Sequence, residues 1–160
     1  NTTVVPPNPS DGDVIFNPDY RLEFYYDGTR SKWLSLVIFE LYFSHTGATS
    51  VNDYLSLKGI SPTLGANFPI SLCFVTSVIQ TNISGTGHQT DFSLMKNGVE
   101  DLVISIDNGK FNQANLGLNH SVVPVSTTQE GYRLKVKAVE QGGTPPVDPL
   151  IILAYRLELL

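Results

Sequence analysis

A chain of 160 residues is long enough to form one domain with a sizeable hydrophobic core. Its net charge is −5 and its ten basic residues are scattered, which argues against a nucleic-acid partner, since such proteins cluster Lys and Arg. Only 16% of the residues are charged, against roughly 25% in average soluble proteins, so we expect part of the surface to lie against other subunits. No segment reaches the roughly 20 apolar residues of a transmembrane helix, and we expect no membrane insertion.

Residues 1–13 predict an extended, proline-rich N-terminal arm. Pro6, Pro7 and Pro9 stand among polar residues, and prolines at this density disfavour a helix. Such an arm either stays disordered or becomes ordered along a neighbouring subunit. If the arm orders, we expect it to contact a neighbouring subunit through Val4, Val5, Pro6 and Pro7.

Residues 14–33 predict a β-hairpin. Leu22, Phe24 and Tyr26 alternate with Arg21, Glu23 and Tyr25, which is the period of a half-buried strand. Turn residues stand on both sides of this strand, as Asn17-Pro18-Asp19 and Asp27-Gly28. We expect Trp33 to cap the hairpin.

Residues 34–43 predict one strand that is apolar on both faces. One face carries Leu36, Ile38 and Tyr42, and the other carries Val37, Phe39, Leu41 and Phe43. A strand of this kind is covered on both sides. One face would meet the core of the domain, and a second subunit is a natural cover for the other.

Further strands are predicted over residues 68–81, 90–96, 99–107, 121–125, 132–139 and 150–160. Asn97-Gly98 lies between two of them and is the strongest short hairpin signal. A Gly/Pro loop over residues 141–149 joins the last two strands. No stretch has a helical period, so we expect an all-β, antiparallel jelly-roll sandwich.

Residues with catalytic or metal-binding potential form no recognisable motif. His45, His88 and His120 each lie in a predicted loop, and no serine stands in a G-x-S-x-G elbow. Cys73 is alone in an apolar run and is predicted to be buried. Metal-ligand spacings are missing as well. We therefore predict no enzymatic activity, no catalytic residues, no cofactor and no metal.

Two parts of the chain resemble known families. Gly12-Asp13 before an apolar strand, an aromatic-rich strand, then Asp27-Gly28 and Trp33 resemble a hairpin common in tailed-phage fibre and other virion proteins. The segments 92–98, 131–137 and 151–157 are similar, in their order and pattern, to the C1q/TNF-like jelly roll.

The second resemblance implies a homotrimer in which residues 34–160 form the jelly-roll domain and the last strand lies near the threefold axis. Strands that are apolar on both faces favour a trimer independently, since subunits of a closed ring bury matching patches. The predicted trimer contacts come from residues 34–43 and from the last strand: Leu36, Ile38, Tyr42, Ile152, Ala154, Tyr155 and Leu157.

We expect a non-enzymatic, homotrimeric viral structural protein on the virion exterior, assembled in the host cytoplasm. It would be either a capsid decoration (cement) protein, which the short chain without a stalk favours, or a bacteriophage tail-fibre or spike tip, which the hairpin favours. Its partners would be copies of itself and either other virion proteins or a host surface receptor. The alternatives are a secreted C1q/TNF-like ligand and a carbohydrate-binding lectin or carbohydrate-active enzyme on the same fold.

Overall fold

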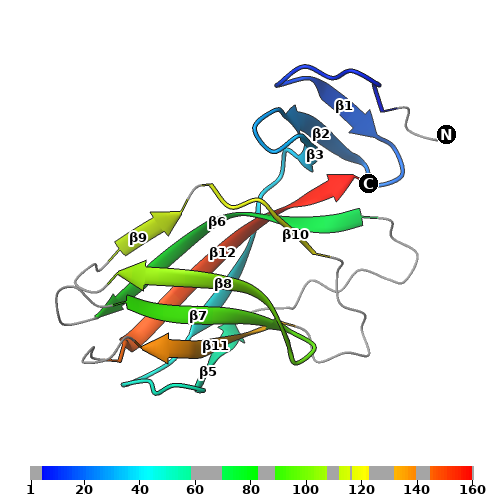
Figure 1. The fold of residues 1–160 in the computed structure, drawn as a ribbon. Helices are drawn as coiled ribbons and strands as arrows, with labels where there is room; N and C mark the ends of the chain where they lie inside the picture. Colours follow the sequence, from blue (N-terminus) through cyan, green and yellow to red (C-terminus); the bar gives the residue numbers. More distant parts are fainter. Residues whose placement is uncertain are drawn as a thin grey trace.

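The computed structural model describes residues 5–58, 70–82, 89–107, 112–115, 117–122, 132–139 and 145–159. In this part of the chain all regular secondary structure is β-strand, and all strand pairs are antiparallel (Figure 1). This confirms the predicted all-β, antiparallel class. The strands are β1 (Val14–Asn17), β2 (Leu22–Asp27), β3 (Lys32–Ser35), β4 (Phe39–Ser44), β5 (Tyr54–Lys58), β6 (Ile70–Asn82), β7 (Gln89–Lys96), β8 (Val99–Asp107), β9 (Asn112–Asn115), β10 (His120–Val122), β11 (Tyr132–Val139) and β12 (Val147–Leu159).

The N-terminal strands form the meander β1–β2–β3, drawn in blue in Figure 1. Asn17 closes the first turn, because its Oδ1 accepts hydrogen bonds from the backbone N–H groups of Asp19, at 2.9 Å, and Tyr20, at 3.2 Å. Phe24 and Trp33 are buried and belong to the main core. Trp33 therefore lies within a third strand, whereas the sequence suggested a cap on a two-stranded hairpin.

Strand β12 connects the N-terminal meander to the rest of the sheet. It pairs with β6 along its length and, on its other edge, with β4 through residues 150–155 and then with β3 at Glu158. Strands β9 and β10 pair with the far edge of β6. The end of β12 thus reaches the meander, as Figure 1 shows.

The sheet bends at β5, which pairs with β4 through one part of its length and with β11 through another. Beyond it the order continues β11–β7–β8. Phe43, Phe74 and Ile151 from the first half of this open sheet share one core with Phe92 and Leu134 from the second half. The two halves therefore face each other across the core.

The prediction of one continuous strand over residues 34–43 is wrong. Strand β3 ends at Ser35 and β4 begins at Phe39, so Leu36, Val37 and Ile38 lie in a break. Ser35 causes part of this break, because its Oγ donates a hydrogen bond to Val37 O, at 2.7 Å, and accepts one from Leu157 N, at 3.0 Å. The hydroxyl of Ser35 thus makes hydrogen bonds that backbone groups make in a continuous β-ladder.

Other boundaries also differ from the prediction. Strands β5 and β9 were not expected from the sequence, and β12 starts at Val147, inside the predicted loop over residues 141–149. Pro149 lies within β12 at a shift in its register with β6. A proline is tolerated there, because a bulge needs no ladder hydrogen bond from its nitrogen.

The Asn97-Gly98 turn joins β7 to β8 as predicted. Asn97 has φ 51° and Gly98 has φ 80°, the left-handed values of a type I′ hairpin turn. A Cβ atom added at Gly98 would meet nothing within 4 Å, so the space around it is open. Glycine is needed there for its backbone conformation alone.

We expect Gly98→Val to lower the free energy of unfolding by about 1 kcal/mol or more, because a β-branched residue is strained at positive φ. Gly98→Asn should cost clearly less, since asparagine tolerates this conformation. Urea unfolding followed by the fluorescence of Trp33 measures both. Equal losses for the two variants would show that φ is not the cause.

Candidate functional site

Exposed apolar side chains occur in the break before β4 and on the side of β4 that faces away from the core. Leu36, Ile38 and Tyr42 keep 45%, 50% and 37% of their surface exposed. Tyr42 lies directly opposite Ile152, which is half-buried, on the neighbouring strand. We call these four residues, Leu36, Ile38, Tyr42 and Ile152, the apolar face. All four belong to the predicted trimer contact.

Hydrogen bonds hold the backbone that carries this face. The N–H of Leu36 donates to Glu23 O, at 2.9 Å. The guanidinium of Arg156 donates through Nη1 to Leu36 O, at 2.7 Å, and to Ser35 O, at 2.5 Å. The same guanidinium lies 5.1 Å from the ring centre of Tyr25. The exposed side chains are therefore presented on a fixed backbone.

Sequence reasoning missed Ser35 and Arg156, which position the apolar face. A signal for Arg156 was available, because it is the one basic residue in the mostly apolar last strand. No local pattern marks Ser35, because its role depends on Leu157, which is distant in the chain.

The other three predicted trimer contacts are buried within the single chain. Tyr155 and Leu157 lie in the main core, and Ala154 packs with Leu34 and Cys73 in a second apolar cluster. Alternation along β12 explains the burial of Tyr155 and Leu157, because its odd-numbered residues point to the main core. Tyr155 and Leu157 are thus not placed to present their side chains to a neighbour.

The structure describes three of the four residues predicted as arm contacts. Val5 and Pro7 are exposed and Pro6 is half-buried, while Val4 lies outside the described residues. The end of the arm is attached to the meander, since Gly12 N donates to Tyr26 O, at 2.9 Å. The described part of the arm is therefore held beside the meander with apolar surface exposed.

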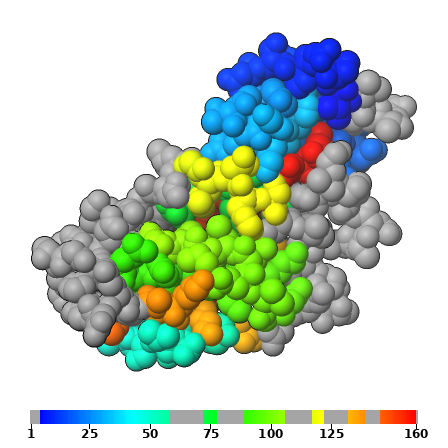
Figure 2. Space-filling model, in the orientation of Figure 1, coloured from blue at the N-terminus to red at the C-terminus, as the bar shows by residue number. Residues whose placement is uncertain are grey.

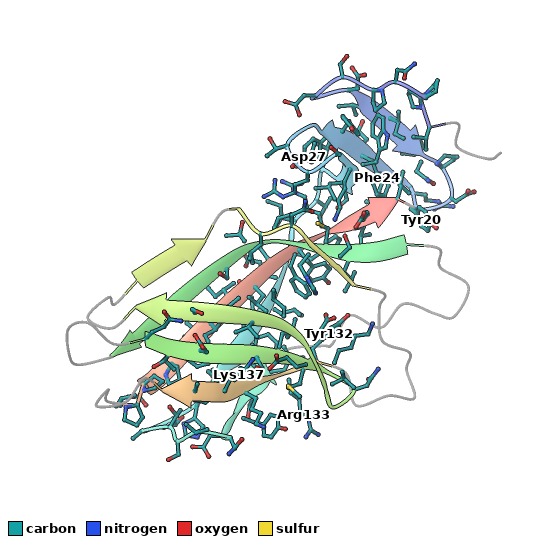
Figure 3. All side chains as sticks on the ribbon, in the orientation of Figure 1. Tyr20, Phe24, Asp27, Tyr132, Arg133 and Lys137 are labelled. Atoms are coloured by element: carbon teal, nitrogen blue, oxygen red, sulfur yellow. The ribbon has the colours of Figure 1, made fainter. Side chains whose placement is uncertain are left out.

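An ion pair between the buried Asp27 and the half-buried Arg30 anchors the turn between β2 and β3. Nη1 of Arg30 lies 2.6 Å from Oδ2 of Asp27, and Nε of Arg30 donates to Leu118 O, at 2.8 Å. Residues 117–122, yellow in Figure 2, lie at the surface between the meander and β8. Figure 3 shows Asp27 on the meander, near this junction. The pair joins the meander to the body of the protein.

A second polar group contains a serine, a lysine and a carboxylate and resembles a nucleophile with its base. The hydroxyl of Ser121 lies between Nζ of Lys32 and Oε2 of Glu158, and these two charged atoms are 3.6 Å apart. A lysine base must be uncharged to take a serine proton, and this ammonium is ion-paired. Cys73 lies 3.7 Å from Lys32 Nζ, but burial raises the pKa of its thiol. We interpret the group as a tie between β3, β10 and β12.

Of the three histidines predicted to lie in loops, His45 does so and His120 does not. His120 is the first residue of β10, with Nε2 at 3.3 Å from Oδ2 of Asp101. His45 follows β4 and is half-buried. His88 lies outside the described residues. Within the described ranges, no three His, Cys, Asp or Glu side chains gather as a metal site by themselves.

Glu100 and Asp101, adjacent on β8, are directed to different partners. Glu100 accepts hydrogen bonds from Ser93 and from Lys137 Nζ, the latter at 2.9 Å, and these bonds lower the pKa of its carboxyl. Asp101 lies beside His120 instead. The two carboxylates therefore do not face each other across a common site.

The described part of the chain contains no helix of a length and hydropathy that would let it cross a lipid bilayer. Comparison of the chain with family models, with curated protein sequences and with solved structures gives no match.

Proposed function

We propose that this chain is a non-enzymatic structural module that self-associates through the apolar face into a homotrimer. The observation that carries the proposal is the exposure of Leu36, Ile38 and Tyr42 on a backbone held by Ser35 and Arg156. Several exposed large apolar side chains in one short segment favour an interaction site, in which the hydroxyl of Tyr42 is bonded to the carboxylate of Glu40. A second copy of the chain is the favoured partner for the apolar face. With only 16% charged residues, the chain has little strongly solvated surface.

The bend at β5 supports a jelly-roll sandwich as the finer description of the fold. Two halves of one antiparallel sheet enclose a common core, which is the layer arrangement of that architecture. In such a trimer, the outer side of β4 and β12 would face the neighbouring subunits.

Light scattering coupled to size-exclusion chromatography tests the proposal. At micromolar concentration we expect a trimer mass for the natural chain and a monomer mass for Tyr42→Lys and Ile152→Lys, because a charged side chain cannot be buried unpaired in an apolar contact. Val103→Lys is the matched control, because Val103 on β8 has the same 37% exposure as Tyr42. It should leave the mass unchanged.

A monomer mass for the natural chain at micromolar concentration would contradict self-association. If Val103→Lys dissociated the assembly as well as Tyr42→Lys, the apolar face would not be the contact. Circular dichroism on each variant separates loss of assembly from loss of folding.

We further propose that the assembled protein lies on the exterior of a virus particle, as decoration or as a fibre tip. The hairpin pattern that ends in Asp27-Gly28 and Trp33 supports this location, as does the exposed arm with Val5 and Pro7. Gold-labelled antibody on particles should mark either the head, for a cement protein, or the tail, for a tip. Unlabelled particles would contradict both locations.

A further inference from the structure

Three basic side chains of β11 lie on the outer side of the second half of the sheet. Leu134 and Val136 are fully buried in the core, so the alternation of the strand turns Arg133, Lys135 and Lys137 away from it. The side chains of Arg133 and Lys137 are labelled in Figure 3. In a chain with a net charge of −5, this strand therefore carries a local excess of positive charge.

An exposed aromatic ring lies beside these charges. The register of β5 and β11 places Tyr54 directly opposite Lys135. The guanidinium carbon of Arg133 lies 5.9 Å from the centre of the Tyr54 ring, and Tyr54 keeps 45% of its surface exposed. We call these four residues, Tyr54, Arg133, Lys135 and Lys137, the basic face.

One end of the basic face already binds a carboxylate of the chain itself. Glu100 on β8 accepts hydrogen bonds from the hydroxyl of Ser93 and from Lys137 Nζ, the latter at 2.9 Å. These two bonds, and then the charges of Lys137 and Lys135, lower the pKa of the Glu100 carboxyl. The face therefore stabilises a carboxylate in its ionised form.

The other end of the basic face, beside Tyr54, has positive charge that Glu100 does not pair. Within the described ranges, Lys135 forms no ion pair with a carboxylate. Asp91 on β7 accepts a hydrogen bond from Ser105 on β8, at 2.6 Å, and is thus held on the far side of its strand from β11. An anion that reaches the Tyr54 ring meets a positive potential there.

The strand pairing limits the kind of anion that fits. Strand β11 pairs with β5 on one edge and with β7 on the other, and β7 pairs in turn with β8. An extended peptide therefore finds no free strand edge within this face to which it could add. Recognition must use side chains, and guanidinium and ammonium groups bind carboxylates. An exposed tyrosine ring offers an apolar surface on which the flat C–H side of a sugar ring can pack.

We propose that the basic face binds an acidic polysaccharide built from uronic acids, whose repeats supply both a carboxylate and a sugar ring. The carboxylate lies against Lys135 and Arg133, and the sugar ring packs on Tyr54. This site lies across the core from the outer side of β4 and β12. It therefore stays accessible in the proposed trimer and does not depend on self-association.

Titration calorimetry with oligogalacturonate, at low salt, tests the proposal on the full chain. We expect binding that is largely lost at about 0.5 M salt, because salt screens exposed charges. Arg133→Gln and Lys135→Gln should each weaken binding by about 10-fold, which is the effect of one charge-assisted hydrogen bond. Arg21→Gln is the matched control, because it removes one exposed positive charge from the meander and should leave binding unchanged.

Two variants of Tyr54 test the contact with the sugar ring. Tyr54→Leu should weaken binding several-fold and clearly more than Tyr54→Phe, which keeps the aromatic ring. Circular dichroism on each variant shows whether it folds. If Arg133→Gln does not fold, Lys135→Gln and Tyr54→Leu decide the question.

Two further ligands separate charge from sugar recognition. The methyl ester of the same oligogalacturonate has the sugars without the charges, and polyglutamate has the carboxylates without the sugars. Both should bind clearly more weakly than oligogalacturonate. The proposal is overturned if oligogalacturonate does not bind, if either of these ligands binds as tightly, or if Arg21→Gln weakens binding as much as Lys135→Gln.

Discussion

Replacement of Phe74 by alanine is expected to lower the free energy of unfolding by about 3–5 kcal/mol. The side chain of Phe74 is fully buried, and its ring contacts those of Tyr132 and Tyr155 edge-on, at 6.2 and 6.0 Å between centroids. These partners come from β11 and β12, so the cavity would open between the two halves of the sheet. Neither half can close it without moving a strand.

Phe16→Ala provides the matched comparison for this variant. Phe16 lies on β1 and is 57% exposed, so the same chemical change should cost much less there. Urea unfolding followed by the fluorescence of the buried Trp33 measures both variants. A loss for Phe74→Ala no larger than the loss for Phe16→Ala would show that the core is not centred on Phe74.

Replacement of Arg30 by methionine should cost about 1–3 kcal/mol of stability at neutral pH, since it leaves the buried carboxylate of Asp27 without its charged partner. Asp27 is only 6% exposed, and Arg30 supplies its backbone N–H, at 3.0 Å, as well as its guanidinium, at 2.6 Å. The variant would also leave the carbonyl of Leu118 without the bond from Nε. Denaturant unfolding at pH 7 measures the loss.

The pH dependence of stability gives an independent readout for Arg30→Met. Burial by itself would raise the pKa of Asp27, but the hydrogen bonds and the charge of Arg30 outweigh it and lower that pKa. Because the folded pKa is the lower one, the carboxylate stabilises the fold above about pH 4 and loses this effect as the pH falls through the folded value. Arg30→Met should weaken this acid dependence.

Lys137→Met is the control, because it breaks an ion pair with Glu100 in which both side chains are more than 40% exposed. Solvent screens such pairs, and we expect no measurable change in stability. Equal effects of Lys137→Met and Arg30→Met would contradict a special role for the buried pair.

Local signals in the sequence were sufficient for most of the strands. Strand β8 has the predicted bounds, and so does β11, because period-two alternation and turn residues are properties of neighbouring residues. Asn97-Gly98 fixes its hairpin for the same reason. The burial of Cys73 also followed from its apolar neighbours and is confirmed.

Strands that depend on a distant partner were harder to find. Strand β9 has the sequence Asn-Gln-Ala-Asn, which carries no strand signal, and it exists because it pairs with β6. Strand β5 had a usable signal, since Leu55 and Leu57 alternate with Ser56, but it is only five residues long. The break after Ser35 depends on Leu157, which no local pattern reveals.

The sequence by itself determined the all-β class, the main hairpin and the four residues of the apolar face, together with three residues that proved buried. Only the tertiary structure decided which apolar residues stay exposed, because Ile152 and Tyr155 look alike in sequence until the register of β12 directs one outward and one into the core. Chain neighbours control local conformation, whereas the meeting of distant side chains depends on the pairing of whole strands.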